Sequence, residues 1–350
     1  MVAVATNPLH NLRDLVQRNC HISDANHAGN YTMCIYLLKM REYYRWEQKQ
    51  SQSSPLKSEQ VGKWLRDREE LWNELESNQF LPINIQGQDI DPFDTNTINK
   101  LINSHGLVYS AGLGIKLTPH FFLAKLESEE TYENYTVYIS STEYARDITS
   151  PPAMTLDNKI YIRKESIKRM IWERYEQWLW NKPNNAMKNT IACYDFKNDI
   201  DSALEEITNH EVENIILHEI GEIQAGKILG QQWESLIAKL PHTKAEIMLR
   251  AIRDHIADSI TTLPTMLHYE NTASIHFYFA NLTNMRKHLS PSLLSAYNDW
   301  LKSGDLSQLK ELITLNRTHW LSLSKKILTL FDNDKQPQKQ IEALIEHSRL

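Results

Sequence analysis

Cysteine is scarce in this chain of 350 residues, which holds only Cys20, Cys34 and Cys193. An odd number at wide spacing excludes a disulfide framework and a CxxC zinc module. Long apolar runs are also missing, since no stretch approaches the roughly 20 residues needed to cross a bilayer. The opening segment MVAVATNPLHNLRDL has no basic region followed by a sustained apolar one, so we expect no secretory signal. These features predict a cytoplasmic protein with reduced thiols and no membrane partner.

A long basic run is absent as well, and the formal net charge is −6. Proteins that bind nucleic acid without sequence preference usually carry a basic stripe, so we expect no nucleic-acid partner. What is present is ordinary for a globular protein, with 41% hydrophobic and 23% charged residues. Nine Trp, fifteen Tyr and eight Phe supply ample material for a core.

The composition changes twice along the chain and predicts three regions. Residues 1–80 are expected to be helical, residues 81–162 to hold a small β-containing region, and residues 163–350 to form a helical domain. Pro, Gly, Asn and Asp become frequent from about residue 80, whereas amphipathic helical patterns return after residue 162. The fold class predicted is mainly α with a small antiparallel β-sheet, an α+β protein with a helical bundle around residues 165–330.

Hydrophobic spacing places the main elements within these regions. Residues 29–48 and 58–77 read as helices on either side of a polar linker, with Ser58 as a helix cap. The runs IKLTPHFFLAKLE, NYTVYISSTEYA and KIYIRK have strand composition. Residues 165–182 read as an amphipathic helix. We expect two further helices over 209–229 and 243–262, the second ending before Pro264.

The segment HEIGE, from His218 to Glu222, is the sharpest chemical signal. A helix places residues i and i+4 on one face, so His218 and Glu222 point the same way. An imidazole and a carboxylate at this spacing can bind one divalent ion. Glu219 occupies the position of the general base in the H-E-x-x-H zinc helix, where it activates a metal-bound water. The pattern predicts a metal site in which Glu222 replaces the second histidine.

The residues around this pair indicate burial. Val212, Ile216, Ile220 and Ile223 form one apolar stripe that we expect to pack on a core. The opposite face is also apolar, with Ile215, Ala225 and Leu229 beside His218 and Glu222. A buried imidazole and carboxylate need partners, because an unpaired buried charge is costly. A metal ion and an arginine are the two candidates.

The following helix, MLRAIRDHIADSITTLP, offers both kinds of partner. Asp254 and Asp258 lie one turn apart, and either carboxylate would complete a His/Glu/Asp metal site between two helices. Arg250 and Arg253 would instead form a buried network with the carboxylates, and His255 lies between the two faces. A third interpretation leaves the aspartates on the solvent-exposed surface, since they face away from the apolar stripe of their helix.

Polar residues elsewhere supply further candidates. His120, in LTPHFFLA, is the best strand-borne residue to join the metal site. Arg41, which shares a helix face with Arg45, would orient a carboxylate or phosphate of the substrate, as would Arg250. His21, Asp24 and His27 are spaced by three and would bind a metal or serve in acid–base chemistry. Their neighbours favour the alternative of a capped, hydrogen-bonded loop that leads into a helix.

Two resemblances follow from these motifs. The block CHISDANHAGNYTMCIYLLKMREYYRWE, HEIGE and RDHIADSITTLP together resemble an uncharacterised family of bacterial proteins of unknown function, over the whole chain. This resemblance implies no activity. HEIGE by itself is similar to the zincin metallohydrolase helix over five residues, with Glu222 where zincins have histidine.

The leading hypothesis is a metal-dependent hydrolase that acts on a small-molecule or peptide substrate. His218 and Glu222 would bind Zn, Mn or Fe with Asp254 or Asp258, and Glu219 would be the general base. A metal-dependent oxidoreductase at the same ligands is the alternative enzyme. The non-enzymatic alternative is a helical interaction protein in which these residues form a buried salt-bridge network. Aromatic residues on the helices would allow a homo-oligomer.

Overall fold

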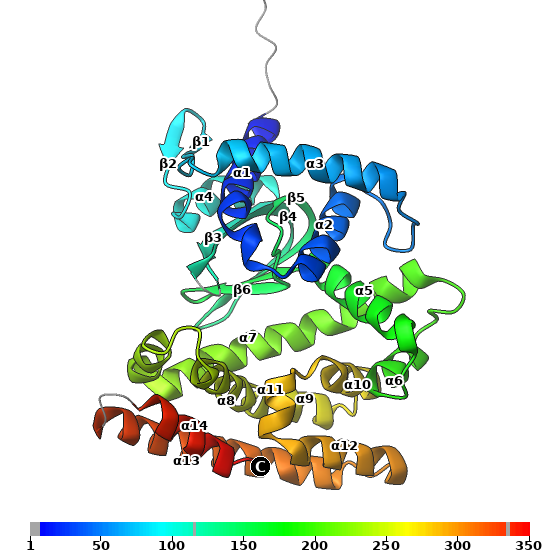
Figure 1. Cartoon of the computed structure of the whole chain (residues 1–350), viewed down its shortest axis with the longest axis vertical. Helices are drawn as coiled ribbons and strands as arrows, with labels where there is room; N and C mark the ends of the chain where they lie inside the picture. Colours follow the sequence, from blue (N-terminus) through cyan, green and yellow to red (C-terminus); the bar gives the residue numbers. More distant parts are fainter. Residues whose placement is uncertain (1–7, 115–116, 334–336) are drawn as a thin grey trace, which may run out of the picture. The chain divides into compact units, whose positions relative to one another are not determined.

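The computed structural model describes residues 8–114, 117–333 and 337–350 (Figure 1). The first half of the segment examined for a secretory signal and the first two residues of IKLTPHFFLAKLE lie outside these ranges. The chain divides into two compact units, of which the first comprises residues 1–173 and 197–208 and the second comprises residues 174–196 and 209–350. Helices α5 (Lys164–Asn181) and α7 (Ile200–Ala238) contribute residues to both units.

The first unit combines helices with two sheets. Its helical elements are α1 (Pro8–His27), η1 (Ala28–Asn30), α2 (Met33–Glu47), α3 (Ser58–Leu75), α4 (Thr95–Ile102) and η2 (Asn103–His105). Its strands are β1 (Ile83–Ile85), β2 (Gln88–Ile90), β3 (Leu107–Leu113), β4 (Pro119–Thr131), β5 (Thr136–Arg146), β6 (Ala153–Leu156) and β7 (Lys159–Arg163). The three strand-like runs of the sequence thus become β4, β5 and β7.

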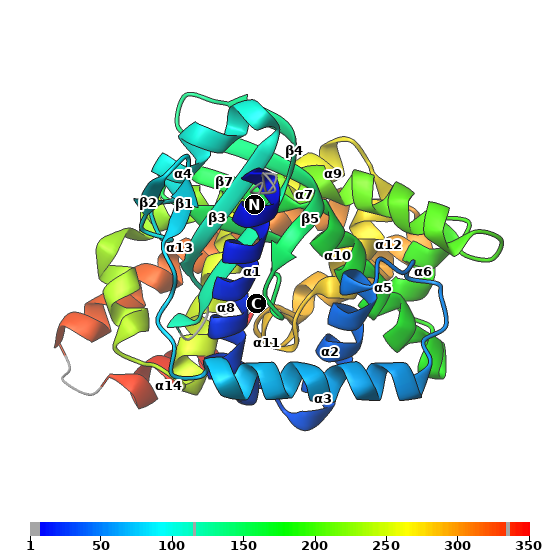
Figure 2. The same cartoon turned by 90° about the horizontal axis from the view of Figure 1, so that it is seen from above.

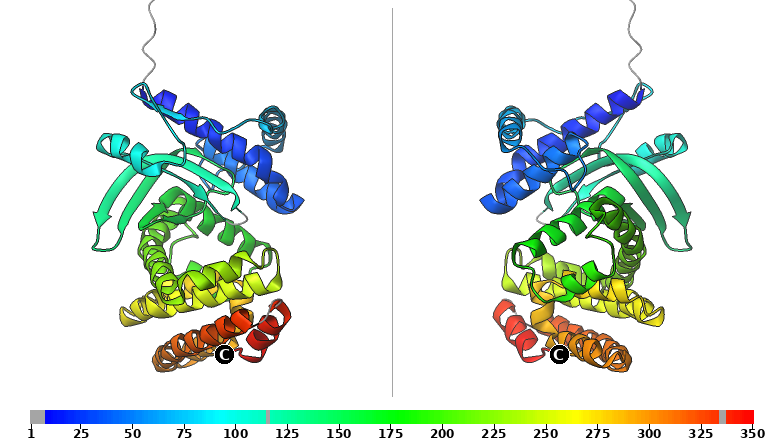
Figure 3. Two further views of the ribbon diagram at one scale, coloured as in Figure 1. Left: turned by 90° about the vertical axis from the view of Figure 1, so that its left-hand side faces the viewer. Right: turned by 90° about the vertical axis from the view of Figure 1, so that its right-hand side faces the viewer.

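The larger sheet has the strand order β3-β4-β5-β7-β6 and is curled (Figure 3). Strands β4 and β5 pair antiparallel, as expected, and β3, which was not expected, pairs antiparallel with β4, but β7 pairs parallel to β5. The sheet is therefore mixed. Strand β6 lies between β5 and β7 in sequence and runs opposite to β7, which lets β7 run in the same direction as β5. Helix α1 runs along β4 and β5 (Figure 2) and buries Leu12, Val16 and Cys20 against Phe121 and other apolar side chains.

The second unit is helical in its described residues. Besides its parts of α5 and α7, it contains α6 (Ala186–Ala192), α8 (Lys244–Ile260), α9 (Thr262–His268), α10 (Thr272–Asn281), α11 (Asn284–Leu289), α12 (Pro291–Ser303), α13 (Ser307–Asn333) and α14 (Gln338–His347). Figure 1 shows α13 alongside α12 and α14. The α+β class and the helical bundle in this part of the chain are confirmed.

The core of the second unit forms around α8. Leu249, Ile252 and Ile256 recur every three or four residues and are fully buried, as their spacing predicts. They pack with α13 and α14 and with Ala225 and Trp233 of α7. The stripe that we expected to bury α7 in a core is instead half-buried at Ile216 and its neighbours.

Several expected element boundaries were wrong for local reasons. Helix α1 continues through Asp24 to His27, where a loop was expected, and Ser58 begins α3 without serving as its cap. Helix α8 does end before Pro264, as expected, and Pro264 lies in the first turn of the next helix, α9, where a proline costs no intrahelical hydrogen bond. No helix of the described ranges is long and apolar enough to cross a membrane.

Candidate functional site

Gly221, the glycine of HEIGE, sets how closely α7 approaches α8. A Cβ atom at this position would lie 2.5 Å from the Thr261 hydroxyl oxygen and 2.6 Å from the Ala257 carbonyl oxygen. The Thr261 hydroxyl donates a hydrogen bond of 2.7 Å to the Leu217 carbonyl. Because only a hydrogen fits at Gly221, the helices meet at the turn that carries His218 and Glu222.

His218 of α7 points at Asp258 of α8. The Nδ1 atom of His218 lies 2.6 Å from Oδ1 of Asp258, and the Asp258 side chain is buried. The surface placement considered for this aspartate is therefore wrong. The two residues meet because α8 turns the face that carries Asp258 toward α7, away from its apolar stripe.

Two residues that the sequence did not single out complete this cluster. Tyr278 of α10 donates a hydrogen bond of 2.8 Å to Oδ2 of Asp258, and Arg286 of α11 forms an ion pair with the same oxygen. Arg286 also donates a 2.7 Å hydrogen bond to the Tyr278 hydroxyl. Both oxygens of Asp258 are therefore occupied, and four helices are joined through one carboxylate.

Glu222 also has a cationic partner. Its Oε1 atom accepts a 3.2 Å hydrogen bond from Nη2 of Arg253, and it lies 3.7 Å from Nε2 of His218. Asp254 lies one turn before Asp258, is half-buried, and has its pKa raised to about 6, first by burial. Glu222, Arg253 and Asp254 therefore extend the group of charged residues around His218.

The charges in the cluster set the protonation state of His218. Burial lowers the pKa of this imidazole, but the nearby charge of Asp258 outweighs burial and raises the pKa to about 9. Burial correspondingly opposes ionisation of Asp258, yet Arg286 and His218 hold the pKa of that carboxyl below its usual range. With these pKa values, the pair is an imidazolium and a carboxylate at neutral pH.

Three further residues considered in the sequence lie in this region, namely Arg250, Glu219 and His255. Arg250 pairs with Glu246 of its own helix at 3.0 Å, so Arg253 and Arg286 are the arginines of the cluster. Glu219 is half-buried on α7. His255 is buried, stacks on Trp320, and places Nε2 3.1 Å from the Arg286 carbonyl oxygen.

Throughout residues 8–114, 117–333 and 337–350, no group of three or more His, Cys, Asp or Glu side chains is arranged to hold a metal ion. Nε2 of His218 lies 3.7 Å from Oε1 of Glu222. The other charged partner of His218 is Asp258, and that of Glu222 is Arg253. His120 belongs to the first unit, where Nδ1 lies 3.2 Å from Oδ2 of Asp147. The expected ligands therefore have protein partners in the described structure, and the metal centre stays a prediction.

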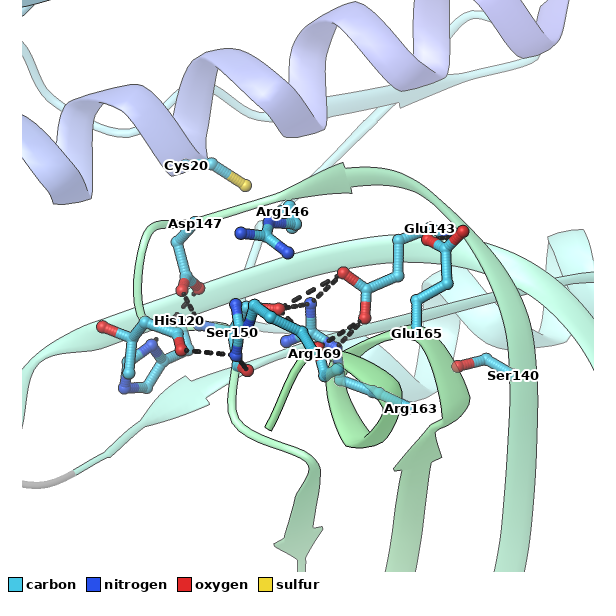
Figure 4. Close-up of polar contacts among 12 residues, drawn as sticks. Cys20, His120, Ser140, Glu143, Arg146, Asp147, Ser150, Arg163, Glu165 and Arg169 are labelled. Atoms are coloured by element: carbon cyan, nitrogen blue, oxygen red, sulfur yellow. Dashed lines mark hydrogen bonds and ion pairs between the residues drawn. The ribbon is translucent and has the colours of Figure 1, made fainter. Parts of the chain in front are cut away.

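The first unit holds a second buried polar cluster, along β5, β7 and the start of α5 (Figure 4). Glu143 receives two hydrogen bonds from Arg163, of 2.9 and 2.8 Å, and both side chains are fully buried. The Ser166 hydroxyl donates a third, of 2.7 Å. The pKa of Glu143 is lowered to about 2, because Arg163 and these hydrogen bonds outweigh burial.

Asp147 continues this cluster at the end of β5. Besides His120, it accepts hydrogen bonds from the backbone N–H groups of Phe121 and Ser150, at 3.2 and 2.7 Å. These contacts keep the pKa of Asp147 below its usual range although burial opposes ionisation. Asp24 of α1 accepts the Ile148 N–H at 3.0 Å, and burial raises the pKa of its carboxyl well above the usual value.

The N-terminal candidates do not form one site. His21 faces Arg68, whose Nη1 lies 2.6 Å from Nε2 of His21, and burial followed by this charge lowers the pKa of the imidazole to about 3. Asp24 holds the backbone of Ile148 instead. Arg41 pairs with the adjacent Glu42 at 2.9 Å. His21 and Asp24 therefore point to different partners, and His27 lies half-buried at the end of α1.

Glu143 and Arg163 were not singled out from the sequence, although charged residues inside strand patterns are a signal that could have found them. Glu143 interrupts the strand NYTVYISSTEYA, and Arg163 is the next-to-last residue of KIYIRK. A charge within such a run needs a buried partner, but the pairing of β5 with β7 decides which one. Arg286 and Tyr278 gave no comparable signal, because each lies in an ordinary helical segment.

Fold and clusters together define an α+β protein with a sheet-containing unit and a helical unit, each organised around a buried ion network. The model of the family of unknown function (DUF6866) N-terminal domain matches residues 11–163, and that of its C-terminal domain matches residues 168–348. The chain belongs to this family, which confirms the resemblance expected from the motifs. The models give no support to the five-residue likeness to zincins. Comparison with curated proteins and with solved structures gives no match.

Proposed function

We propose that the second unit acts by interaction and not by catalysis at HEIGE, with the residues around His218 forming a structural ion network. The observation that carries this proposal is the saturation of Asp258 by His218, Tyr278 and Arg286. A buried carboxylate with three cationic or hydroxyl partners has little capacity left for a metal ion. Its role is to hold α7, α8, α10 and α11 in one arrangement, which would present a fixed helical surface to a partner protein.

A double-mutant cycle tests the network directly. His218→Gln, Asp258→Asn and the double variant are compared with wild type by urea unfolding, and we expect a coupling energy of about 1 to 3 kcal/mol. Asp258→Asn alone is expected to cost roughly 3 to 5 kcal/mol, since it leaves Arg286 without its charge partner.

The pair formed by Asp299 and Lys302 of α12 is the matched control. Its side chains are exposed, and the same cycle on this pair should give no more than about 0.5 kcal/mol. A His218–Asp258 coupling as small as that of the control would reject the structural network.

The metal-dependent hydrolase remains the second candidate, with the oxidoreductase as its variant at the same residues. One observation favours it, because Asp258 holds Nδ1 of His218 and leaves Nε2 facing Glu222. Metal-bound histidines usually have a carboxylate on their second nitrogen in this way. Binding of Zn, Mn or Fe would require Glu222 to leave Arg253 and His218 to lose a proton. Metal analysis of the purified protein separates the two candidates.

We infer a cytoplasmic location from the thiols. Cys34 and Cys193 are exposed and free, and Cys20 is free and buried. Exposed free thiols persist in a reducing compartment. Fractionation of the producing cells tests this inference, and recovery with the envelope fraction would oppose it.

A further inference from the structure

Arg146, the last residue of β5, is a buried arginine, and two of its guanidinium nitrogens have no hydrogen-bond partner in the described part of the chain. It is 2% exposed, and its Nε and Nη2 atoms have no hydrogen-bond partner. In Figure 4 it carries no dashed line, whereas Glu143, Asp147 and Ser150 do. Burying an unpaired guanidinium is costly, so an anionic partner would be strongly favoured at this position.

The Arg146 side chain is held in place by aromatic rings. Its guanidinium carbon lies 5.3 Å from the ring centroid of Tyr43 and 5.2 Å from that of Trp46, both on α2. The Tyr43 hydroxyl also donates a 3.0 Å hydrogen bond to the Arg146 carbonyl. An arginine fixed between aromatic rings keeps its planar set of donors oriented, which suits recognition of an oxyanion by two parallel hydrogen bonds.

Other cations gather near Arg146. Arg169 of α5 is buried, and the pKa of its guanidinium is lowered to about 10 by burial and then by the charge of Arg146. Burial and then the charge of Arg169 lower the pKa of Lys39 to about 8, and Arg146 adds to this effect. The Nε atom of Arg169 and Nη1 of Arg163 are also buried without a hydrogen-bond partner. After burial, repulsion by a neighbouring arginine is thus the next cause of the lowered pKa values of Arg169 and Lys39.

The charge of Arg146 acts on Glu143, Asp24 and Glu165, but no acidic group of this region accepts a hydrogen bond from its Nε or Nη2 atom. Glu143 is paired with Arg163, Asp147 is held by His120 and backbone N–H groups, and Glu173 lies 3.5 Å from Arg169. Asp24 and Glu165 both have raised pKa values, so that the charge they contribute near neutral pH is reduced.

We propose that Arg146, with Arg169 and Lys39, forms a binding site in the first unit for a small oxyanion, the phosphate or carboxylate group of a ligand. The site is distinct from the network around His218. It needs no covalent step, since the ligand replaces missing hydrogen bonds of the guanidinium groups.

Calorimetry and thermal unfolding of the full chain test this site with two probes, inorganic phosphate and malonate. We expect at least one probe to raise the unfolding temperature of wild type. Arg146→Met should weaken its binding roughly tenfold to hundredfold. Without the probe, the unfolding temperature of Arg146→Met should equal or exceed that of wild type, because the variant removes an unpaired buried charge.

Two further variants keep the test decisive. Lys39 is half-buried. The Lys39→Gln substitution should therefore weaken binding of the probe without loss of folding. Lys168→Gln is the matched control, because Lys168 precedes Arg169 but pairs with Glu205, and it should bind like wild type. Which probe binds more tightly distinguishes a phosphate ligand from a carboxylate ligand. Absence of binding by both probes, or equal binding by wild type and Lys39→Gln, would overturn the proposal.

Discussion

At the scale of single residues, the protonation of His218 is the most sensitive feature of the helical unit. Its pKa is raised to about 9, whereas an unfolded histidine has a pKa near 6.5. The folded state therefore binds this proton more tightly than the unfolded state. The resulting stabilisation is complete below pH 6.5 and is lost as the pH rises through 9.

We predict that the free energy of unfolding of wild type exceeds that of His218→Gln at pH 6. This difference should shrink by roughly 2 to 3 kcal/mol between pH 6 and pH 9.5. Urea unfolding of both proteins over this range measures the difference. A difference between wild type and His218→Gln that stays constant over this pH range would contradict the assigned ion pair.

The sequence identified half of this cluster. His218, Glu222, Asp254 and Asp258 were selected from helical spacing, and the structure brings His218 to both Glu222 and Asp258. Spacing alone left open whether a metal ion or an arginine accompanies them. Arg286 and Tyr278 are distant in sequence. The packing of α11 against α8 brings Arg286 to Asp258, and the Tyr278 hydroxyl reaches Asp258 from α10.

At the scale of the elements, the approach of α7 to α8 depends on Gly221. We predict that Gly221→Ala lowers the free energy of unfolding by about 1 to 3 kcal/mol, because its methyl group meets the Ala257 backbone and the Thr261 hydroxyl. Thermal and urea unfolding measure the loss.

Gly226→Ala on the same helix is the control. An added Cβ there meets nothing within 4 Å, so the substitution should raise stability by roughly 0.5 to 1 kcal/mol through helix propensity. Equal effects of the two substitutions would show that the helices do not meet at Gly221.

Elements with a strong periodic pattern were predictable, and those set by pairing were not. The spacing of Leu249, Ile252 and Ile256 predicts both α8 and its buried face. The expected end of the HEIGE helix at Leu229 matches a change at Gly230, whose φ of 74° and ψ of 177° interrupt the helical backbone. The parallel pairing of β5 with β7 was missed, because strand direction depends on the path of the chain between strands and not on strand composition.

At the scale of the whole molecule, each of the two compact units is built from two separate stretches of the chain. The family models divide the sequence between residues 163 and 168, but the first unit also uses residues 164–173 and 197–208. Ile167, Ile171 and Leu204 in these segments are fully buried. The three regions expected from composition stay a prediction.

We predict that a fragment of residues 1–163 unfolds at lower temperature, or is more readily digested, than a fragment of residues 1–208. The longer fragment retains the buried side chains of α5 and the start of α7, together with the ion pair of Lys168 with Glu205. Circular dichroism and limited proteolysis compare the fragments. Equal stability would mean that the added segments do not support the first unit.

The most direct test of the structural network is elemental analysis by inductively coupled plasma mass spectrometry, on protein purified without chelator or nickel affinity steps. His218→Ala and Glu222→Ala are measured beside wild type. The network proposed here predicts Zn, Mn and Fe well below one ion per chain in folded wild type, with no further loss in either variant. Near-stoichiometric metal in wild type that disappears in both variants would contradict it and would establish the metal centre.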